Sequence, residues 1–334
     1  MLAFVPGALI ACSGDDSGGR VGAAAVDPSG DVMQTLIGQI PSAAIEAKGA
    51  WIVITDYGAA SELAGLERPG PDAAGAELIE WRMAVAGLEE DAMIAAQDPK
   101  ILRARSGGDV QAEYGWSVGD VSSFAEASAP GDLFLIVDTD SVSVDDLDAA
   151  LEPQSDGRWN SSESDDSLIT ASDGNLVVST SEELVDDWAD QNDPLSDDER
   201  MMSIAAALDA NGAYSAIVAE GALQPFQDVP EDAELMSGFD AFGVGLTVVD
   251  DDPAAVLVYH YPSEDEASDA VEQTRTVLTE GTMLTTRGRA GEYFRDVVVV
   301  ADDQTVVATA TFLERPMAIW QMVSNADIVV VSSS

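Results

Sequence analysis

Acidic side chains are the most frequent groups in this chain that could do chemistry. The 334 residues include 62 Asp and Glu against 14 Lys and Arg. Two clusters have spacings that calcium could use: Asp138 with Asp140, and Asp250 with Asp251 and Asp252. The first cluster lacks the Gly and the final Glu that an EF-hand loop requires, and turns favour Asp without any ion. We therefore expect no dedicated metal site and keep these five aspartates as candidates for weak calcium binding.

No catalytic motif accompanies the carboxylates. The sequence has no GxxxxGK[ST] loop, no strand-linked GxGxxG, no GxSxG elbow and no HExxH, so we expect neither a nucleotide nor a cofactor. The single histidine, His260, lies in VLVYHYP. A partly buried imidazole at a strand end explains it, whereas a general base would need an orienting carboxylate and a nucleophile.

Cys12 is the residue whose position points most directly to a modification. It is the only cysteine, so no internal disulfide can form. It ends the sequence LIAC, which closes an apolar run from Leu2 to Ala11. This pattern resembles the lipobox of prokaryotic lipoproteins, in which the cysteine takes a diacylglyceryl group and becomes the first residue after cleavage. The resemblance implies lipidation at Cys12.

The residues around Cys12 fit a secreted and anchored protein. Residues 1–11 would form the signal peptide, and residues 12–31, rich in Gly, Ser and Asp, a flexible tether. A secretory signal usually begins with Lys or Arg and is longer, so we expect the true start codon to lie upstream. Acyl chains on the cysteine would anchor the protein to the membrane. We therefore expect it at the outer face of the cytoplasmic membrane.

The formal net charge of −48 excludes most nucleic-acid functions. A nucleic-acid binder needs a basic stripe, and the basic residues here are scattered along the chain. Solubility in a salty or cation-rich medium explains the charge, and it leaves a halophilic archaeal source open beside a bacterial one. No stretch of 18 apolar residues occurs, so we expect no internal membrane span.

The tryptophans are the remaining candidates for a contact surface. Trp51, Trp188 and Trp320 lie in strand or helix contexts that favour core packing. Trp159 lies instead in the Ser- and Asp-rich sequence GRWNSSESDD. We expect Trp159 to be exposed and to contact a partner.

Alternating strand and helix patterns must position these residues. Runs rich in Val and Thr, bounded by Asp, Gly and Pro, predict strands, and longer runs of good helix formers predict helices. In two of the helices, Ser196 and Ser263 are expected to cap the first turn, each with a Glu three residues later. The predicted strands are 51–55, 133–137, 175–180, 213–219, 244–249, 254–261, 296–301, 305–312 and 327–331, and the predicted helices 75–96, 181–189, 196–209 and 263–278.

An internal repeat organises these elements. Four blocks recur in the same order, and the pairs begin at Gly49 and Gly212, Tyr114 and Phe242, Leu133 and Val256, and Ser172 and Ala301. The repeat predicts an α+β fold with mainly antiparallel sheets in two related lobes, produced by internal duplication. Residues 32–195 would form lobe 1, with a helical insertion near 72–106, and residues 196–334 lobe 2. Whether the lobes share one sheet stays open.

Three blocks carry a resemblance to a known family. WIVITDYGAASELAGLERPG, YGWSVGDVSSFAEASAPG and the strand-turn-helix from Leu133 are similar to an uncharacterised family of actinobacterial secreted lipoproteins. The resemblance implies location and fold and brings no catalytic residues. We expect a lipid-anchored, non-catalytic protein that binds another envelope protein or a small ligand, or acts structurally. The alternative is a secreted hydrolase that uses carboxylates in a cleft between the lobes.

Overall fold

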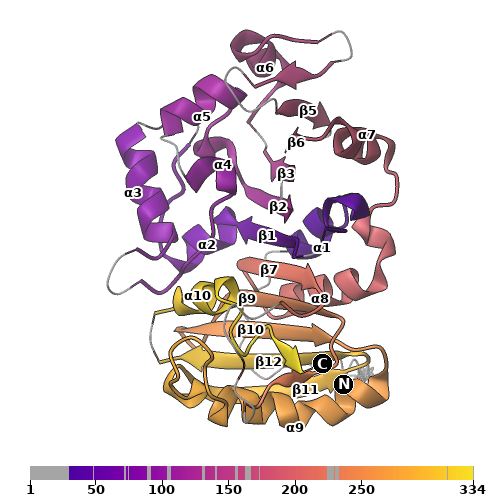
Figure 1. Ribbon diagram of the computed structural model, residues 1–334. Coiled ribbons are helices and arrows are strands. Elements are labelled where there is room, and N and C mark those ends of the chain that lie inside the picture. The colour runs from indigo at the N-terminus through magenta and orange to yellow at the C-terminus, as the bar shows by residue number, and fades with distance from the viewer. Residues whose placement is uncertain are drawn as a thin grey trace, which may run out of the picture.

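One antiparallel sheet of eleven strands dominates the computed structural model (Figure 1). The structure describes residues 30–47, 49–70, 73, 75–88, 92–103, 107–129, 132–139, 141–154, 157–161, 167–172, 174–223, 229, 233–313 and 315–333. The strand order is β11-β12-β10-β9-β7-β1-β2-β3-β6-β5-β4, and a separate parallel pair joins β8 to β13. The strands are β1 (Trp51–Asp56), β2 (Ser123–Ala129), β3 (Asp132–Asp138), β4 (Trp159–Asn160), β5 (Leu168–Ser172), β6 (Asn175–Ser179), β7 (Ser215–Glu220), β8 (Met236–Ser237), β9 (Ala241–Val249), β10 (Asp252–His260), β11 (Phe294–Asp302), β12 (Thr305–Phe312) and β13 (Ser332–Ser333).

Helices cover both faces of the sheet. Helices α1, α7 and α8 pack on one face, and α2 to α6, α9 and α10 contribute to the apolar layer on the other. The helices are α1 (Val32–Ile37), α2 (Tyr57–Leu63), α3 (Gly75–Val85), α4 (Lys100–Arg103), α5 (Gly107–Tyr114), α6 (Val144–Ala150), α7 (Glu182–Asp190), α8 (Glu199–Ala210), α9 (Glu264–Glu280) and α10 (Ala318–Ser324), with the 3-10 turns η1 (Ser42–Ala44), η2 (Val118–Asp120), η3 (Leu195–Asp197) and η4 (Ala290–Glu292).

The strand sequences explain why both faces are covered. Successive side chains of a strand point to opposite faces, and in β1 the side chains on both faces are apolar. Val53 joins the cluster under α2 to α6, whereas Ile52 and Ile54 join the cluster under α1 and α8. A strand that is apolar on both sides requires a helical layer on each. The result is three layers: helix, sheet and helix.

The sheet has two halves that meet where β1 pairs with β7. Counted outward from this junction, the order is β1-β2-β3-β6-β5-β4 on one side and β7-β9-β10-β12-β11 on the other. Both halves contain three strands, then a helix, a hairpin and a further helix, but the first half adds α2 to α5 after β1 and β4 before the hairpin, and the second adds β8 after β7. One continuous sheet therefore spans the molecule, which answers the question that the sequence left open.

A crossing segment, residues 94–97, ties the two halves together on the face that carries α10. The Tyr214 hydroxyl accepts a hydrogen bond from the Ala95 N–H at 3.0 Å, and the Trp320 indole donates to the Ala95 carbonyl at 2.6 Å. Thr55 of β1 donates to the Gln97 carbonyl at 2.9 Å. Residues from both halves thus hold a single stretch of backbone, and burial raises the pKa of the Tyr214 hydroxyl well above its usual range.

Helix α8 lies unusually close to β9, and two glycines permit it. A Cβ on Gly243 would lie 2.4 Å from Cγ2 of Ile204, and one on Gly245 would lie 2.8 Å from Cδ2 of Leu208. Real side chains do not approach so closely. The Gly243-Val-Gly245 sequence therefore serves helix-sheet packing.

Several predicted elements differ in the structure. Residues 327–331 form turns, not a strand, although Val329 and Val330 are fully buried. The predicted helix 75–96 ends at Val85, and the crossing segment is not helical. The cap of α8 is Asp198, which accepts from the N–H groups of the first turn, and not Ser196. Ser263 caps α9 as predicted, with its hydroxyl accepting from the Glu266 N–H at 3.3 Å.

The two outermost strands differ from the inner ones. Strand β4 has only two residues. Strand β11 shifts its register against β12 between Arg295 and Val298, and Asp296 at that irregularity has φ 51°. Arg295 forms an ion pair with Asp252 of the neighbouring hairpin.

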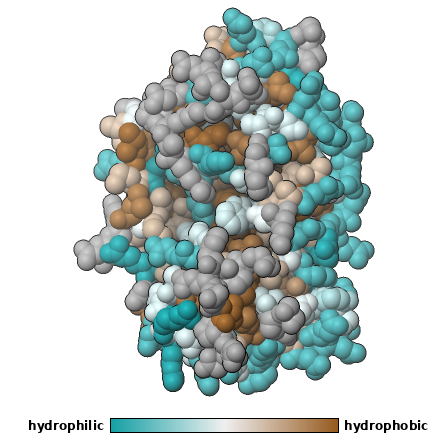
Figure 2. Space-filling model, viewed as in Figure 1, coloured by the Kyte–Doolittle hydropathy of each residue, from teal (hydrophilic) through white to brown (hydrophobic). Residues whose placement is uncertain are grey.

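The surface is mostly hydrophilic. Hydrophilic residues cover the side that carries α7 and α8, at the right of Figure 2, whereas hydrophobic residues gather over α3 at the upper left. There Ile79 and Met83 are 45% and 49% exposed. Among the described residues, no helix is both long and apolar enough to cross a membrane.

Candidate functional site

A groove runs along the chain segment that links the two halves of the sheet. The link, residues 193–196, lies beside residues 38–42, which follow α1. Leu195 N–H donates to the Ile40 carbonyl at 2.8 Å, and Ser42 N–H donates to the Asp193 carbonyl at 2.9 Å. Both apolar side chains of this pairing, Leu195 and Ile40, are buried. The floor of the groove is therefore backbone fixed by hydrogen bonds.

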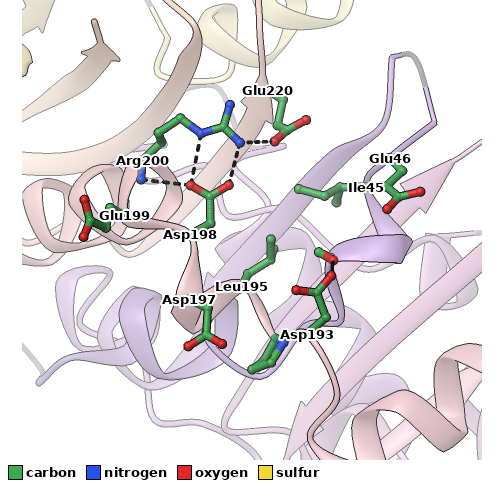
Figure 3. A pocket seen from close by; sticks show the side chains of 11 residues that line it. Ile45, Glu46, Asp193, Leu195, Asp197, Asp198, Glu199, Arg200 and Glu220 are labelled. Carbon is green, nitrogen blue, oxygen red and sulfur yellow. Dashed lines mark hydrogen bonds and ion pairs between the residues drawn. The ribbon is translucent and has the colours of Figure 1, made fainter. Parts of the chain in front are cut away.

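An acidic hollow lies on one side of the link (Figure 3). Its volume is about 530 Å³, within the range of small-molecule sites, about 300 to 1,000 Å³. Six carboxylates and one guanidinium line it, so its potential is negative. The lining residues are Ser42, Ile45, Glu46, Asp193, Pro194, Leu195, Asp197, Asp198, Glu199, Arg200 and Glu220.

Arg200 is neutralised within this hollow. Its Nη2 lies 2.6 Å from Asp198 Oδ2 and 2.5 Å from Glu220 Oε1, as the dashed lines in Figure 3 show. Burial would raise the pKa of Asp198, but the hydrogen bonds and charge of Arg200 outweigh it and hold the pKa below 3.8. Asp198 also accepts from backbone N–H groups at the start of α8. It is thus an ionised structural carboxylate.

This geometry bears on the hydrolase alternative. General acid catalysis needs a carboxyl group with a raised pKa, and Asp198 shifts in the opposite direction. Asp193 is engaged by the Ser42 hydroxyl, and Glu199 points away from the other carboxylates in Figure 3. The acidic hollow therefore resembles an electrostatic surface more than a catalytic pair.

A tryptophan hollow lies on the other side of the link and shares Pro194 and Asp197 with the first. Its volume is about 650 Å³. Trp188, at the end of α7, is half-buried against the apolar layer and also lines the hollow. The lining residues are Gly38, Gln39, Pro41, Thr170, Ala171, Ser172, Asn175, Asp187, Trp188, Ala189, Gln191, Asn192, Pro194, Ser196 and Asp197.

Comparisons with known proteins give no family. No family model matches the chain, and no curated protein matches it. Two solved structures of a protein called TP0453 are similar to it. Crystal form I has 8% identity and a TM-score of 0.37, over 86% of this chain and 97% of that one. Crystal form IV has 7% identity and a TM-score of 0.38, over 85% and 96%. Similarity at this level transfers neither residues nor activity to this chain.

The calcium candidates do not come together in space. Asp138 ends β3, whereas Asp250 and Asp251 form the turn after β9 and Asp252 begins β10, and three strands separate β3 from β9 in the sheet. Asp138 accepts from the Ser123 hydroxyl at 3.2 Å. Asp140 and Cys12 lie outside the described residues. Within the described part of the chain, no group of three or more His, Cys, Asp or Glu side chains is arranged to hold a metal.

His260 has the orienting carboxylate that the sequence could not identify. Its Nδ1 lies 2.7 Å from Asp240 Oδ1. The imidazole is 4% exposed at the end of β10. There His260 pairs with Ala241 of β9, and Ala241 pairs with Glu220 of β7, which lines the acidic hollow. This arrangement fits the expected buried imidazole with a satisfied ring nitrogen.

Trp159 is not the exposed contact residue that its sequence context indicated. It is 3% exposed, and its indole N–H donates to Asp148 Oδ1 at 2.9 Å. The strand pairing of β4 with β5 brings it into the apolar layer. A polar sequence neighbourhood thus surrounded a core residue, and we withdraw Trp159 as a contact candidate.

Trp188 is the residue that sequence reasoning assigned only to the core. Its spacing from Leu184 places both on the apolar face of α7, which is why core packing was expected. Its position in the last turn, three and four residues before the side-chain amides of Gln191 and Asn192, was the available signal. That signal predicts a binding site only when it is known that residues 38–41 lie opposite Trp188 and line the same hollow.

Proposed function

We propose that this protein is a lipid-anchored, extracytoplasmic binding protein without catalytic activity, and that the groove along residues 193–196 is its ligand site. The observation that carries the proposal is the pair of ligand-sized hollows on either side of the link. Both have polar linings on a rigid floor, and preorganised concave sites of this kind favour binding. The lipobox-like LIAC sequence supports the location.

The anchor is tested directly by labelling. Cells that express the protein are grown with radioactive palmitate, and the wild type is compared with the Cys12→Ser variant. We expect label and membrane association in the wild type and loss of both in the variant. An unlabelled wild type whose membrane association survives Cys12→Ser would exclude the anchor.

Ligand occupancy of the groove is tested by site-specific crosslinking. A photoreactive phenylalanine analogue replaces Ser196, which lines the tryptophan hollow and is exposed. The control places the analogue at Asp269, which is exposed on α9. We expect a light-dependent adduct in whole cells from position 196 and none from position 269. The absence of an adduct at 196 would exclude an occupied groove.

The alternative function remains a secreted hydrolase with carboxylates between the halves. It is supported by the location of the acidic hollow beside the link, and it is opposed by the lowered pKa of Asp198. Replacing Glu46 and Asp193 together by their amides, both of which line the acidic hollow alone, would abolish hydrolysis but leave binding in the tryptophan hollow intact. Retained turnover of any substrate in that variant would exclude the acidic hollow as its catalytic site.

We also infer that the two halves of the sheet arose by duplication, with the boundary near residue 195. The matching strand orders support this inference, as does the position of three of the four sequence blocks on corresponding elements, β1 with β7, β3 with β10, and β6 with β12. Membership of the actinobacterial-type lipoprotein family stays a proposal. A profile built from close relatives would test the duplication, because it should align residues 32–195 with residues 196–334, and the sources of those relatives would test the family.

A further inference from the structure

We propose that the tryptophan hollow binds an uncharged saccharide, with the sugar ring against Trp188. This inference rests on the proposed binding function, for which it names the ligand class. It depends on three properties of the hollow: one aromatic wall, several planar amides, and no basic side chain in its lining.

The aromatic wall offers a flat surface for a sugar. A pyranose ring presents C–H bonds on its faces and hydroxyl groups around its edge. An indole ring is broad and apolar on its face and carries one N–H donor at its edge. Trp188 is half-buried, so its inner side packs on the protein and a part stays accessible. It lies in the last turn of α7, one turn after the buried Leu184, and packs against the same apolar cluster.

The amides match the edge of the same ligand. A primary amide offers a donor pair and an acceptor, which suits vicinal hydroxyl groups. Gln39 and Asn175 are already oriented by each other, because Asn175 Nδ2 donates to Gln39 Oε1 at 3.3 Å. Asn192 Nδ2 donates to Asp187 Oδ1 at 3.4 Å. These amides come from three elements and retain further hydrogen-bonding capacity.

Some polar groups of the hollow are unpaired in the protein. Three side-chain groups make no hydrogen bond with any described residue: the Trp188 indole N–H, the side-chain amide of Gln191 and the Thr170 hydroxyl. An apolar ligand would leave such groups without a partner once water is displaced, and that is costly. A polyhydroxylated ligand would satisfy them.

The charge of the site selects an uncharged sugar. Asp187 and Asp197 are the charged residues of the lining, and the acidic hollow adjoins them across the link. A carboxylated or sulfated sugar would enter a negative potential without a cation to meet it. The volume of about 650 Å³ lies within the range for sites of small ligands and suits an oligosaccharide end better than a single ring.

Titration calorimetry with the full chain tests the proposal. The probes are maltotriose, cellotriose, mannotriose and chitotriose, with the galacturonic acid trimer as an anionic probe. We expect saturable binding of at least one neutral trisaccharide. We expect the anionic probe to bind at least about tenfold more weakly because of the negative potential.

Matched tryptophan variants locate the binding. Trp188→Ala should weaken the affinity for that trisaccharide about tenfold, and Trp188→Phe should weaken it less, since a smaller aromatic face remains. Trp51→Ala is the control, because Trp51 is likewise half-buried at the border of an apolar layer but lies outside the hollow. Melting temperatures of all variants confirm that each is folded.

The outcomes separate this proposal from the general binding function. No saturable heat with any neutral trisaccharide, or equal losses in Trp188→Ala and Trp51→Ala, would overturn saccharide binding. If the crosslink from position 196 is then still formed, the groove binds another class of ligand and only the saccharide inference fails. If the crosslink is absent too, the binding function fails with it.

Discussion

Buried carboxylates in this protein serve as hydrogen-bond acceptors for backbone. Asp209, on α8, accepts from the N–H groups of Met33 and Gln34 at 2.9 and 3.0 Å and thereby caps α1 from a distant part of the chain. Asp327, which is only 1% exposed, accepts hydrogen bonds from three backbone N–H groups. The donors are Leu284 at 2.6 Å, Thr285 at 3.1 Å and Ile328 at 2.8 Å. Orphan N–H groups at a helix start need such partners. Among the many acidic residues, burial identifies the few carboxylates that stabilise the fold through hydrogen bonds to backbone.

Replacement of Asp209 by Asn should reveal its shifted ionisation. Burial raises its pKa above the usual 3.8 against the opposing hydrogen bonds from Gln34 and Met33. A raised folded pKa means that the contribution of Asp209 to stability is complete below 3.8 and falls as pH rises through the folded value. We expect the advantage of the wild type over Asp209→Asn in the free energy of unfolding to shrink from pH 4 to pH 7. Urea unfolding measures it.

The control for this experiment is Asp269→Asn, which removes the same charge from an exposed position on α9. Its stability difference from the wild type should show no such loss with rising pH. A wild-type advantage at position 209 that grows with pH would contradict the raised pKa.

At the scale of elements, the contact of α8 with β9 depends on missing side chains. A methyl group at Gly243 would collide with Ile204, so helix or strand would have to shift. We expect Gly243→Ala to lower the free energy of unfolding by about 1–3 kcal/mol, the usual range for overpacking. The matched change Gly75→Ala, at the open start of α3, should leave stability unchanged or slightly raise it. Denaturant midpoints compare them, and equal effects would contradict close packing.

The turn between β9 and β10 has the geometry of a two-residue hairpin turn, but its two residues are not the ones that this geometry favours. Asp250 and Asp251 have φ of 51° and 67°, and such turns prefer Asn followed by Gly. We expect the double change Asp250→Asn with Asp251→Gly to raise the free energy of unfolding by about 1 kcal/mol, the order of the left-handed penalty for an ordinary residue. Thermal unfolding at fixed salt is the measurement.

A second pair of substitutions separates backbone geometry from charge. Asp250→Ala with Asp251→Ala removes the same two charges but introduces residues that disfavour positive φ. It should destabilise the hairpin. If both double variants stabilise the protein equally, relief of charge repulsion explains the effect and turn geometry does not.

Strands were predictable where their own residues favour them, and elements that depend on neighbours were not. Strand β12 spans the predicted residues 305–312, because the β-branched residues Val and Thr make up most of that segment. Strand β2, SFAEASA, has no β-branched residue and was missed. It is a strand because β1 and β3 pair with it on both sides. Residues 327–331 show the reverse. Their apolar sequence predicted a strand, but the structure buries these residues in turns.

The candidate site could not be predicted from the sequence for a related reason. Much of its lining comes from residues 38–46 and 187–200, and nothing in either segment indicates that the other lies opposite. The link near Pro194 was predicted as a boundary because it interrupts the pattern of elements. That a boundary would be lined by Trp188 and amides follows only from the three-dimensional arrangement.

At the scale of the whole molecule, one sheet joins both halves into a single framework. Strands β1 and β7 pair across the junction, and the crossing segment is hydrogen-bonded both to Thr55 of the first half and to Tyr214 of the second. Local opening at this junction would expose apolar residues on both faces. Such coupling favours one cooperative unfolding transition, in contrast to two independently folding lobes.

Salt should stabilise this framework. Residues 131–200 alone contain 21 acidic residues against Arg158 and Arg200. The Debye length falls from about 30 Å at 0.01 M to about 3 Å at 1 M, so added NaCl relieves repulsion across the molecule. We expect the melting temperature to rise with NaCl over this range, and calorimetry or fluorescence can follow it.

Calcium provides the control for specific binding. At equal ionic strength CaCl2 and NaCl should stabilise the protein to similar degrees, because screening does not depend on a site. A large, saturable effect at low millimolar calcium would contradict this expectation, since a real site stabilises by mass action. Asp138, Asp140 and Asp250 to Asp252 would then be the residues to replace first.

The outermost strands have a consequence for self-association. A sheet of eleven strands ends in two rows of unpaired backbone groups, and such edges are templates for pairing with another copy. Here β4 offers only two residues, and β11 is interrupted between Arg295 and Val298, with charged Arg295 and Asp296 exposed. Neither edge presents a long, regular strand. Copies of this protein crowded together on a surface would therefore resist polymerising edge to edge, however extensive the sheet within each copy.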